Sequence, residues 1–188
     1  MSLRCFIAID ISVQTRNELG ELIDILKKCN GDVKWVMPEN VHVTLKFLGD
    51  TAEDMLPKIG ASLSAVISSY KPFSIKVHGT GVFPSGKSPR VIWVGLEDSD
   101  MLKSLKGGIE NTMSAFGYQK EDKEFRPHLT IGRVRSRRGM IGVMNELDNF
   151  KERDFGELRV DRIIFMKSEL RPKGAEYTCL FDLAFEGD

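Results

Sequence analysis

Apolar residues recur with helical spacing in four segments of the chain. The first segment follows Ser12, a residue type that caps helix N-termini, and its apolar residues are three or four positions apart: Val13, Leu19, Leu22, Ile23 and Leu26. Similar spacing predicts a second helix from near Thr51, a third over residues 99–116 and a fourth near residues 140–150.

The remaining apolar segments are typical of strands. Phe73, Ile75 and Val77 alternate with polar residues, as expected for a half-buried strand. Further strands are predicted over residues 3–10, 33–36, 41–48, 91–96, 125–134, 157–169 and 175–185, with a Gly-rich connection over 79–89 and a turn at 171–174. Many strands with two helices in each half of the chain predict an α+β fold, with helices packed on antiparallel sheets.

Composition excludes several classes of protein. The chain has 188 residues, 41% of them hydrophobic, and its 27 basic residues balance 27 acidic ones. This apolar content is too high for a disordered chain, and no apolar run approaches the roughly 18 residues needed to span a bilayer. The first ten residues do not resemble a signal peptide. The three cysteines, Cys5, Cys29 and Cys179, are far apart and are expected to be reduced, so a cytoplasmic protein is predicted.

Two of the three histidines lie in a repeated tetrapeptide. His42-Val43-Thr44-Leu45 and His128-Leu129-Thr130-Ile131 both read His-apolar-Thr-apolar, and both fall in predicted strands. Because side chains alternate along a strand, each histidine shares a face with its threonine, and the apolar residues point to the other face. The copies are 86 residues apart, which predicts two similar lobes whose central strands approach each other across a cleft.

The two imidazoles suit acid–base chemistry at a phosphate. With an ordinary pKa near 6.5, one ring can be neutral and the other protonated at working pH. A base would then deprotonate a nucleophile while the acid protonates the departing oxygen, and the threonines would hold substrate oxygens. Neither histidine has a second metal ligand at normal spacing, so no metal is expected. No phosphate-binding Gly-rich loop is present, so ATP is not implied.

A basic cluster surrounds the second tetrapeptide in this otherwise neutral chain. Six basic residues and one acidic residue lie between Lys123 and Arg138. Arginine suits bidentate phosphate contact, which makes Arg126 and Arg133 candidate substrate ligands. Arg133 would face away from His128 on a regular strand, but a bulge at Gly132 would redirect it. Lys46 shares the predicted face of His42 and Thr44 and is a weaker candidate.

For several other residues the sequence leaves more than one role open. Arg135, Arg137 and Arg138 either bind the substrate or form a solvated surface. The aromatic residues Trp35, Phe83 and Trp93 either stack on a base or belong to the core. His78 lacks a matching partner and is interpreted as a residue on a polar sheet face.

Five blocks of the sequence, in order, resemble the RNA 2′,3′-cyclic phosphodiesterases, also called 2′-5′ RNA ligases, of the two-histidine phosphoesterase superfamily. The blocks cover nearly the whole chain: residues 4–9, 35–49, 79–84 with 89–93, 126–133, and 170–177. Both tetrapeptides fit the HXTX motif of that family. The resemblance implies one two-lobed domain over residues 1–188, with two pseudo-symmetric antiparallel sheets backed by helices and a central cleft.

The same resemblance implies the function. His42 would be the proton donor, His128 the proton acceptor, and Thr44 and Thr130 would hold the non-bridging oxygens while a 2′,3′-cyclic phosphate RNA end opens to a 2′-phosphate. Ligation would be the same displacement with an RNA 5′-hydroxyl in place of water. The enzyme is expected to act as a monomer without cofactor or membrane. Two alternatives remain open: a phosphodiesterase acting on small cyclic nucleotides, and a non-catalytic module that binds RNA ends.

Overall fold

The computed structural model describes residues 1–86, 88–172 and 174–186. Strands and helices are mixed along this part of the chain, as the sequence predicts. The strands are β1 (Ser2–Asp10), β2 (Val33–Trp35), β3 (His42–Ala52), β4 (Phe73–Phe83), β5 (Val91–Leu96), β6 (His128–Val134), β7 (Asp154–Val160), β8 (Arg162–Arg171) and β9 (Gly174–Ala184). The helices are α1 (Val13–Lys27), α2 (Leu56–Ile67), α3 (Asp100–Ala115) and α4 (Met140–Asp148), with short 3₁₀ turns η1 (Pro38–Asn40) and η2 (Glu53–Met55).

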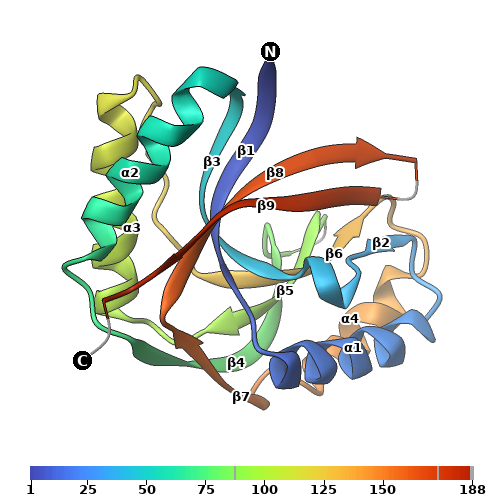
Figure 1. The fold of residues 1–188 in the computed structure, drawn as a ribbon. Helices are drawn as coiled ribbons and strands as arrows, with labels where there is room; N and C mark the ends of the chain where they lie inside the picture. The colour runs from blue at the N-terminus through green and yellow to red at the C-terminus, as the bar shows by residue number, and fades with distance from the viewer. Residues whose placement is uncertain (87, 173, 187–188) are drawn as a thin grey trace.

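The strands described here form one antiparallel sheet in the order β7-β4-β5-β6-β3-β1-β8-β9, and β2 pairs with β6 beside this path. The sheet is strongly curled (Figure 1). The two strands that contain the tetrapeptides, β3 and β6, are neighbours at its centre. The α+β prediction is confirmed, and the two predicted sheets are halves of a continuous one that meet between β3 and β6.

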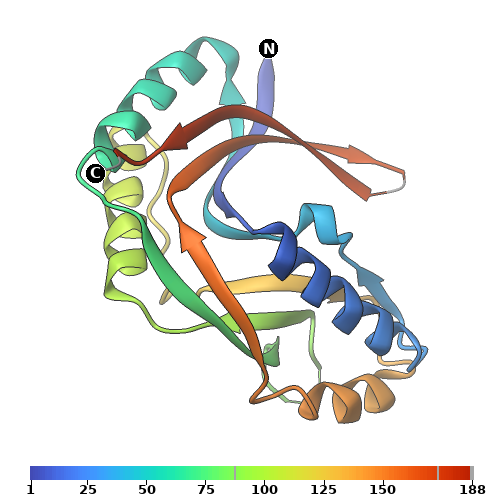
Figure 2. The same cartoon turned by 60° about the horizontal axis from the view of Figure 1, so that its bottom comes forward.

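The helices pack in two pairs against the two halves of the sheet. Helices α1 and α4 contact each other and the strands β7 and β4, whereas α2 and α3 contact each other and the strands β9 and β3. Figure 2 shows the pairs at opposite ends of the curled sheet. Each pair combines a helix from the first half of the sequence with one from the second. Each lobe is therefore built from both halves of the chain.

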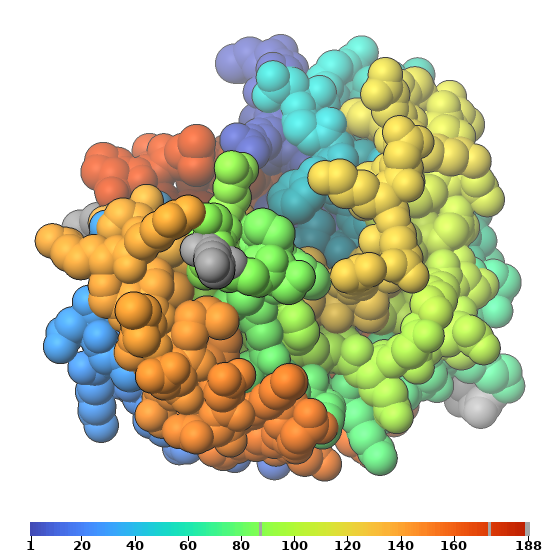
Figure 3. Space-filling view, turned by 180° about the vertical axis from the view of Figure 1, so that it is seen from behind, coloured from blue at the N-terminus to red at the C-terminus, as the bar shows by residue number. Residues whose placement is uncertain are grey.

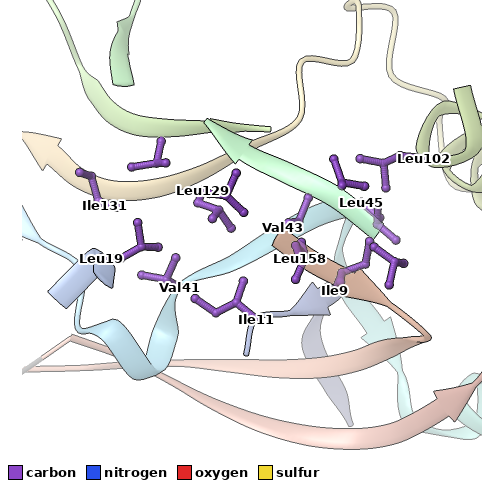
Figure 4. Packing of buried hydrophobic residues seen from close by; sticks show 14 of the residues in the cluster. Ile9, Ile11, Leu19, Val41, Val43, Leu45, Leu102, Leu129, Ile131 and Leu158 are labelled. Carbon is purple, nitrogen blue, oxygen red and sulfur yellow. The ribbon is translucent and has the colours of Figure 1, made fainter. Parts of the chain in front are cut away.

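The hydrophobic core lies under the tetrapeptides. Val43, Leu45, Leu129 and Ile131 are all at most 1% exposed. Figure 4 shows them with Ile9 and other apolar side chains that pack between the sheet and the helices. The apolar positions of both tetrapeptides thus anchor their strands, and the polar positions remain on the opposite face.

The helix predicted from Thr51 begins later. Thr51 is a buried strand residue that pairs with Leu3, and its hydroxyl accepts a hydrogen bond of 3.0 Å from Tyr118. The strand β3 therefore continues to Ala52, and α2 begins at Leu56, with Pro57 in its first turn, where a missing N–H costs nothing.

Two predicted segments in the second half of the sequence also differ. Residues 79–83 continue β4 rather than starting a loop: Gly79 has a positive φ of 73° at a bulge, and a Cβ there would lie 2.6 Å from the Lys151 carbonyl oxygen. The strand predicted over 157–169 is two strands, because β7 pairs with β4 and β8 pairs with β1. The hairpin of β8 and β9 is as predicted, although Lys173 of its turn lies outside the described residues.

Candidate active site

The two tetrapeptides lie side by side. Val43 of β3 pairs with Leu129 of β6 in an antiparallel register. Continuing this register by one residue each way places His42 opposite Thr130 and Thr44 opposite His128. Residues at these positions share the face opposite the buried Val43 and Leu129, and His42 and His128 are diagonal neighbours, with backbone positions about 7–8 Å apart by strand geometry. The four polar side chains thus form one cluster with approximate twofold symmetry.

Both imidazoles are fixed by the same backbone contact. The Nδ1 atom of His42 lies 2.8 Å from the carbonyl oxygen of Asn40, and Nδ1 of His128 lies 2.7 Å from the carbonyl oxygen of Arg126. A carbonyl oxygen can only accept a hydrogen bond, so Nδ1 must be the donor in each ring. Nε2 is therefore the nitrogen left to accept or donate a proton at the cluster.

Aromatic rings pack against both histidines. Phe6 stacks on His42 with ring centroids 4.8 Å apart, and Tyr177 meets the same ring edge-on at 5.3 Å. Phe83 meets His128 edge-on at 5.1 Å. These contacts restrict each imidazole to one orientation and remove water from part of its surface.

Burial lowers the pKa of both histidines below the ordinary 6.5. The backbone hydrogen bonds oppose this effect, whereas the positive charge of Arg133 adds to it in both cases. Asp10, which pairs with His42 across β1 and β3, raises the pKa of His42, and no carboxylate has this effect on His128. The two rings therefore differ in their electrostatic surroundings, because the charge of Asp10 favours the protonated form of His42.

A cavity of about 520 Å³ lies beside the cluster. Its lining includes His42, Thr44, Thr130 and Arg133, and its wall on the other side comes from the hairpin of β8 and β9, with Tyr177. His128 is not a lining residue of this cavity, and lies two positions before Thr130 on β6. The side chain of Asn40 donates a hydrogen bond of 3.0 Å to the Ala175 carbonyl, which ties this hairpin to the strand of His42.

A bulge directs Arg133 into the cavity. On β6, Gly132 pairs with Ile92 and Thr130 with Trp93, so Ile131 is an extra residue. The extra residue reverses the alternation, and Arg133 joins the face of His128 and Thr130. The prediction that a bulge at Gly132 redirects the side chain of Arg133 is confirmed.

Lys46 does not share the face of His42 and Thr44, contrary to the prediction. On β3, Lys46 pairs with Ile7 and Thr44 with Ala8, so Leu45 is an extra residue and Lys46 turns into the core. It is 1% exposed. Its ammonium group lies 2.7 Å from Glu110 and donates 2.8 Å to the Gln119 carbonyl.

The sequence places this chain in a family. Residues 21–172 match the family model of the 2′-5′ RNA ligase superfamily. The chain belongs to this superfamily. Two curated relatives, both named RNA 2′,3′-cyclic phosphodiesterase, are similar over nearly their whole length. The relative from Methanothermobacter thermautotrophicus is 35% identical over 181 residues, 95% of this chain and 96% of the relative. The relative from Thermotoga maritima is 36% identical over 185 residues, 98% of this chain and 97% of the relative.

Solved structures have the same fold as this superfamily member. A crystal structure from Thermus thermophilus has a TM-score of 0.82 at 29% identity and covers 99% of this chain and 100% of its own. Escherichia coli LigT, crystallised with 3′-AMP, has a TM-score of 0.78 at 20% identity, with 98% and 99% coverage, a likeness of fold alone.

The structure also places the other candidate residues that the sequence of this superfamily member suggested. The side chain of Arg126 is 69% exposed, binds Glu124 at 3.0 Å and does not line the cavity; its carbonyl, which holds His128, is its contribution to the cluster. His78 is exposed on β4, as interpreted from the sequence. Trp35 lines the cavity, whereas Phe83 packs between Trp93 and His128.

Sequence reasoning missed several residues around His42. Phe6, Asp10 and Tyr177 act on this ring through stacking, charge and an edge-on contact. Phe6 and Tyr177 fall in two of the family-like blocks, which was the available signal. Their partnership with His42 joins β1, β3 and β9, and no local pattern reports which strands are neighbours.

The part of the chain that the structure describes contains no group of three or more His, Cys, Asp or Glu side chains arranged to hold a metal ion. Among the same residues, no helix is both long and apolar enough to cross a bilayer.

Proposed function

We propose that this protein hydrolyses RNA 2′,3′-cyclic phosphate ends to 2′-phosphomonoesters, with His128 as the base and His42 as the acid. An enzyme of this kind is supported by the family and by the names of the two relatives. The observation that supports the mechanism best is the matched pair of imidazoles, each with Nδ1 bound to a carbonyl oxygen and Nε2 free for proton transfer.

The displacement proceeds in one step. Nε2 of His128 takes a proton from water as the water oxygen bonds to phosphorus. The bond between phosphorus and O3′ breaks, and Nε2–H of His42 gives its proton to O3′, which leaves a 2′-phosphate. Strain in the cyclic phosphate drives the opening, so no nucleotide is consumed. Burial lowers the pKa of both rings, which favours the neutral form that a base needs, and Asp10 favours the protonated form of His42 that an acid needs.

The remaining groups hold the phosphate. The hydroxyls of Thr44 and Thr130 and the guanidinium of Arg133 bind the non-bridging oxygens, where charge develops in the transition state. Ligation to a 2′-5′ linkage follows when an RNA 5′-hydroxyl replaces water. In this proposal residues 1–188 act as one domain and as a cytoplasmic monomer, without metal, ATP or membrane.

The test is the product formed from an RNA that ends in a 2′,3′-cyclic phosphate. We expect a 2′-phosphomonoester, identified by chromatography against both isomers, and the same rate in EDTA. A 3′-phosphate product would contradict the assignment of O3′ as the leaving group. Binding of the RNA end without turnover would favour a non-catalytic end-binding module.

A further inference from the structure

The arginines of this protein fall into two groups. Six form ion pairs with carboxylates: Arg16, Arg126, Arg153, Arg159, Arg162 and Arg171. The other six, Arg4, Arg90, Arg133, Arg135, Arg137 and Arg138, have no carboxylate of residues 1–86, 88–172 or 174–186 within ion-pair distance. The guanidinium groups of these six arginines are therefore not engaged in direct ion pairs with the described carboxylates and can bind an anion.

Five of these six arginines line two cavities. Arg4 and Arg133 line the catalytic cavity described above. Arg90, Arg135 and Arg137 line a second cavity of about 740 Å³, between the end of β6, the segment before β5 and the start of α4. Figure 3 shows the orange surface of residues near 140 against the green surface of residues near 90.

The second cavity has a cationic part and an apolar part. The apolar part comes from Met140, Ile141 and Met144 on α4, and Ile141 is 81% exposed. The guanidinium of Arg137 donates to the Ser88 hydroxyl, and the backbone of Arg135 is fixed by a hydrogen bond of 2.9 Å from its N–H to the Asp32 carbonyl. Guanidinium groups suit phosphates, and thioether and aliphatic surfaces suit the faces of bases.

The strand β6 and the residue that follows it contribute to both cavities. Thr130 and Arg133 of β6 line the catalytic cavity, and the next two residues, Val134 and Arg135, line the second. Two residues of a strand span about 7 Å, so a chain held at Arg133 reaches Arg135 with little additional length. A polyanion whose end is in the first cavity can therefore continue into the second.

We propose that the second cavity binds the RNA chain on the 5′ side of the reacting cyclic phosphate. Arg90, Arg135 and Arg137 contact its phosphates, and the apolar surface of Met140, Ile141 and Met144 packs against a base. This assignment rests on the proposed function and gives it a substrate preference: oligonucleotide ends over cyclic mononucleotides. Charge complementarity favours RNA over a second copy of this neutral protein.

The experiment compares two substrates, a nucleoside 2′,3′-cyclic phosphate and a ten-nucleotide RNA with the same end, using the full chain. For the Arg135→Gln/Arg137→Gln variant we expect KM for the RNA to rise about tenfold, with kcat unchanged. The mononucleotide does not reach the second cavity, so its kcat/KM should change less than twofold. The double variant removes two arginine–phosphate interactions, so the dependence of log KM on log salt should fall by about 1.4, at about 0.7 for each interaction. Arg159→Gln, which removes an exposed arginine outside both cavities, is the matched control.

The outcomes separate this inference from the proposed function. If the wild-type protein opens neither substrate, the proposed function fails. If it opens both with the same KM, or if the variant loses both activities equally, the second cavity does not bind RNA. A change in sedimentation with no change in KM would assign the surface to a second copy and overturn the inference. Ile141→Ser, which removes apolar surface without changing charge, tests the same cavity if the double variant does not fold.

Discussion

The strands β3 and β6 contain the same tetrapeptide pattern and the same irregularity, yet different residues follow it. In both strands the residue after the threonine is extra: Leu45 on β3 and Ile131 on β6. In both, the next residue is buried and the one after it turns to the cavity face. The buried position is Lys46 in one strand and Gly132 in the other, and the cavity position is Phe47 or Arg133.

This difference follows from what packs beneath each strand. Gly132 faces β2, where a Cβ would lie 2.8 Å from Val33 and 3.1 Å from Trp35, so no larger residue fits without movement. Lys46 faces α3, where Glu110 binds both Lys46 and Lys106, and Lys106 donates 2.7 Å to the Leu45 carbonyl. One bulge is fixed by close packing and the other by buried charge. The comparison teaches that two strands with matched local geometry can present different side chains to the core and to the cavity.

The largest effect is expected when the buried ion pairs of Glu110 with Lys46 and Lys106 are removed. Glu110→Gln leaves two buried ammonium groups without a full counter-charge, and we expect the free energy of unfolding to fall by about 3–5 kcal/mol in urea denaturation. Glu121→Gln, at the half-exposed partner of Lys106, should cost under about 1 kcal/mol. Equal losses would show that the burial of Glu110 does not increase its contribution to stability.

The same variant should alter the pH dependence of stability. Burial alone would raise the pKa of Glu110, but the hydrogen bonds from Lys106 and Lys46 hold it below the ordinary 4.5. The stability from this group is therefore present above that value and is lost as pH falls through the folded-state pKa. Glu110→Gln should remove this part of the acid sensitivity.

The second effect tests whether the two histidines are equivalent in catalysis. His42→Ala and His128→Ala should each lower turnover of a cyclic-phosphate RNA by roughly 10² or more, the usual scale for loss of an acid or base. His78→Ala, at the exposed third histidine, should leave turnover unchanged. If one of the two catalytic variants retained full activity, the acid–base pair would be excluded.

A smaller effect is expected at the threonines. In the proposed mechanism Thr44 and Thr130 each donate one hydrogen bond to the phosphate. We therefore expect Thr44→Ala and Thr130→Ala to lower kcat roughly tenfold, by analogy with the net value of a hydrogen bond to a charged group. Serine at either position should recover most of the activity because it keeps the hydroxyl. Failure of serine to recover activity would assign threonine a packing role.

The smallest effect is expected from the charge of Arg133, the residue that the β6 bulge turns to the cavity. The charge of Arg133 lowers the pKa of both histidines, in addition to the larger effect of burial, so Arg133→Gln should move both limbs of the pH profile of kcat/KM to higher pH. Arg159→Gln should leave both limbs in place. Limbs that stay fixed or move to lower pH in Arg133→Gln would place the guanidinium away from the rings.

The sequence alone determined which residues could do the chemistry and the face on which each pair lies. His42 with Thr44, and His128 with Thr130, share a face because alternation is a local property of any strand, and both apolar anchors follow from the same rule. It also identified Gly132 as the point where alternation could break. The same local rule predicted Lys46 incorrectly, because no glycine marks the bulge on β3.

Only the tertiary structure decided which strands are neighbours and which side chains are in contact. The pairing of Val43 with Leu129, the contacts of Phe6 and Tyr177 with His42, and the ion pairs of Lys46 join residues far apart in the chain. A strand accommodates an extra residue according to the hydrogen bonds of its neighbours, so the position of a bulge depends on the whole sheet. Side-chain direction beyond the tetrapeptides, and with it the difference between a buried lysine and a cavity-facing arginine, is therefore a property of the folded sheet.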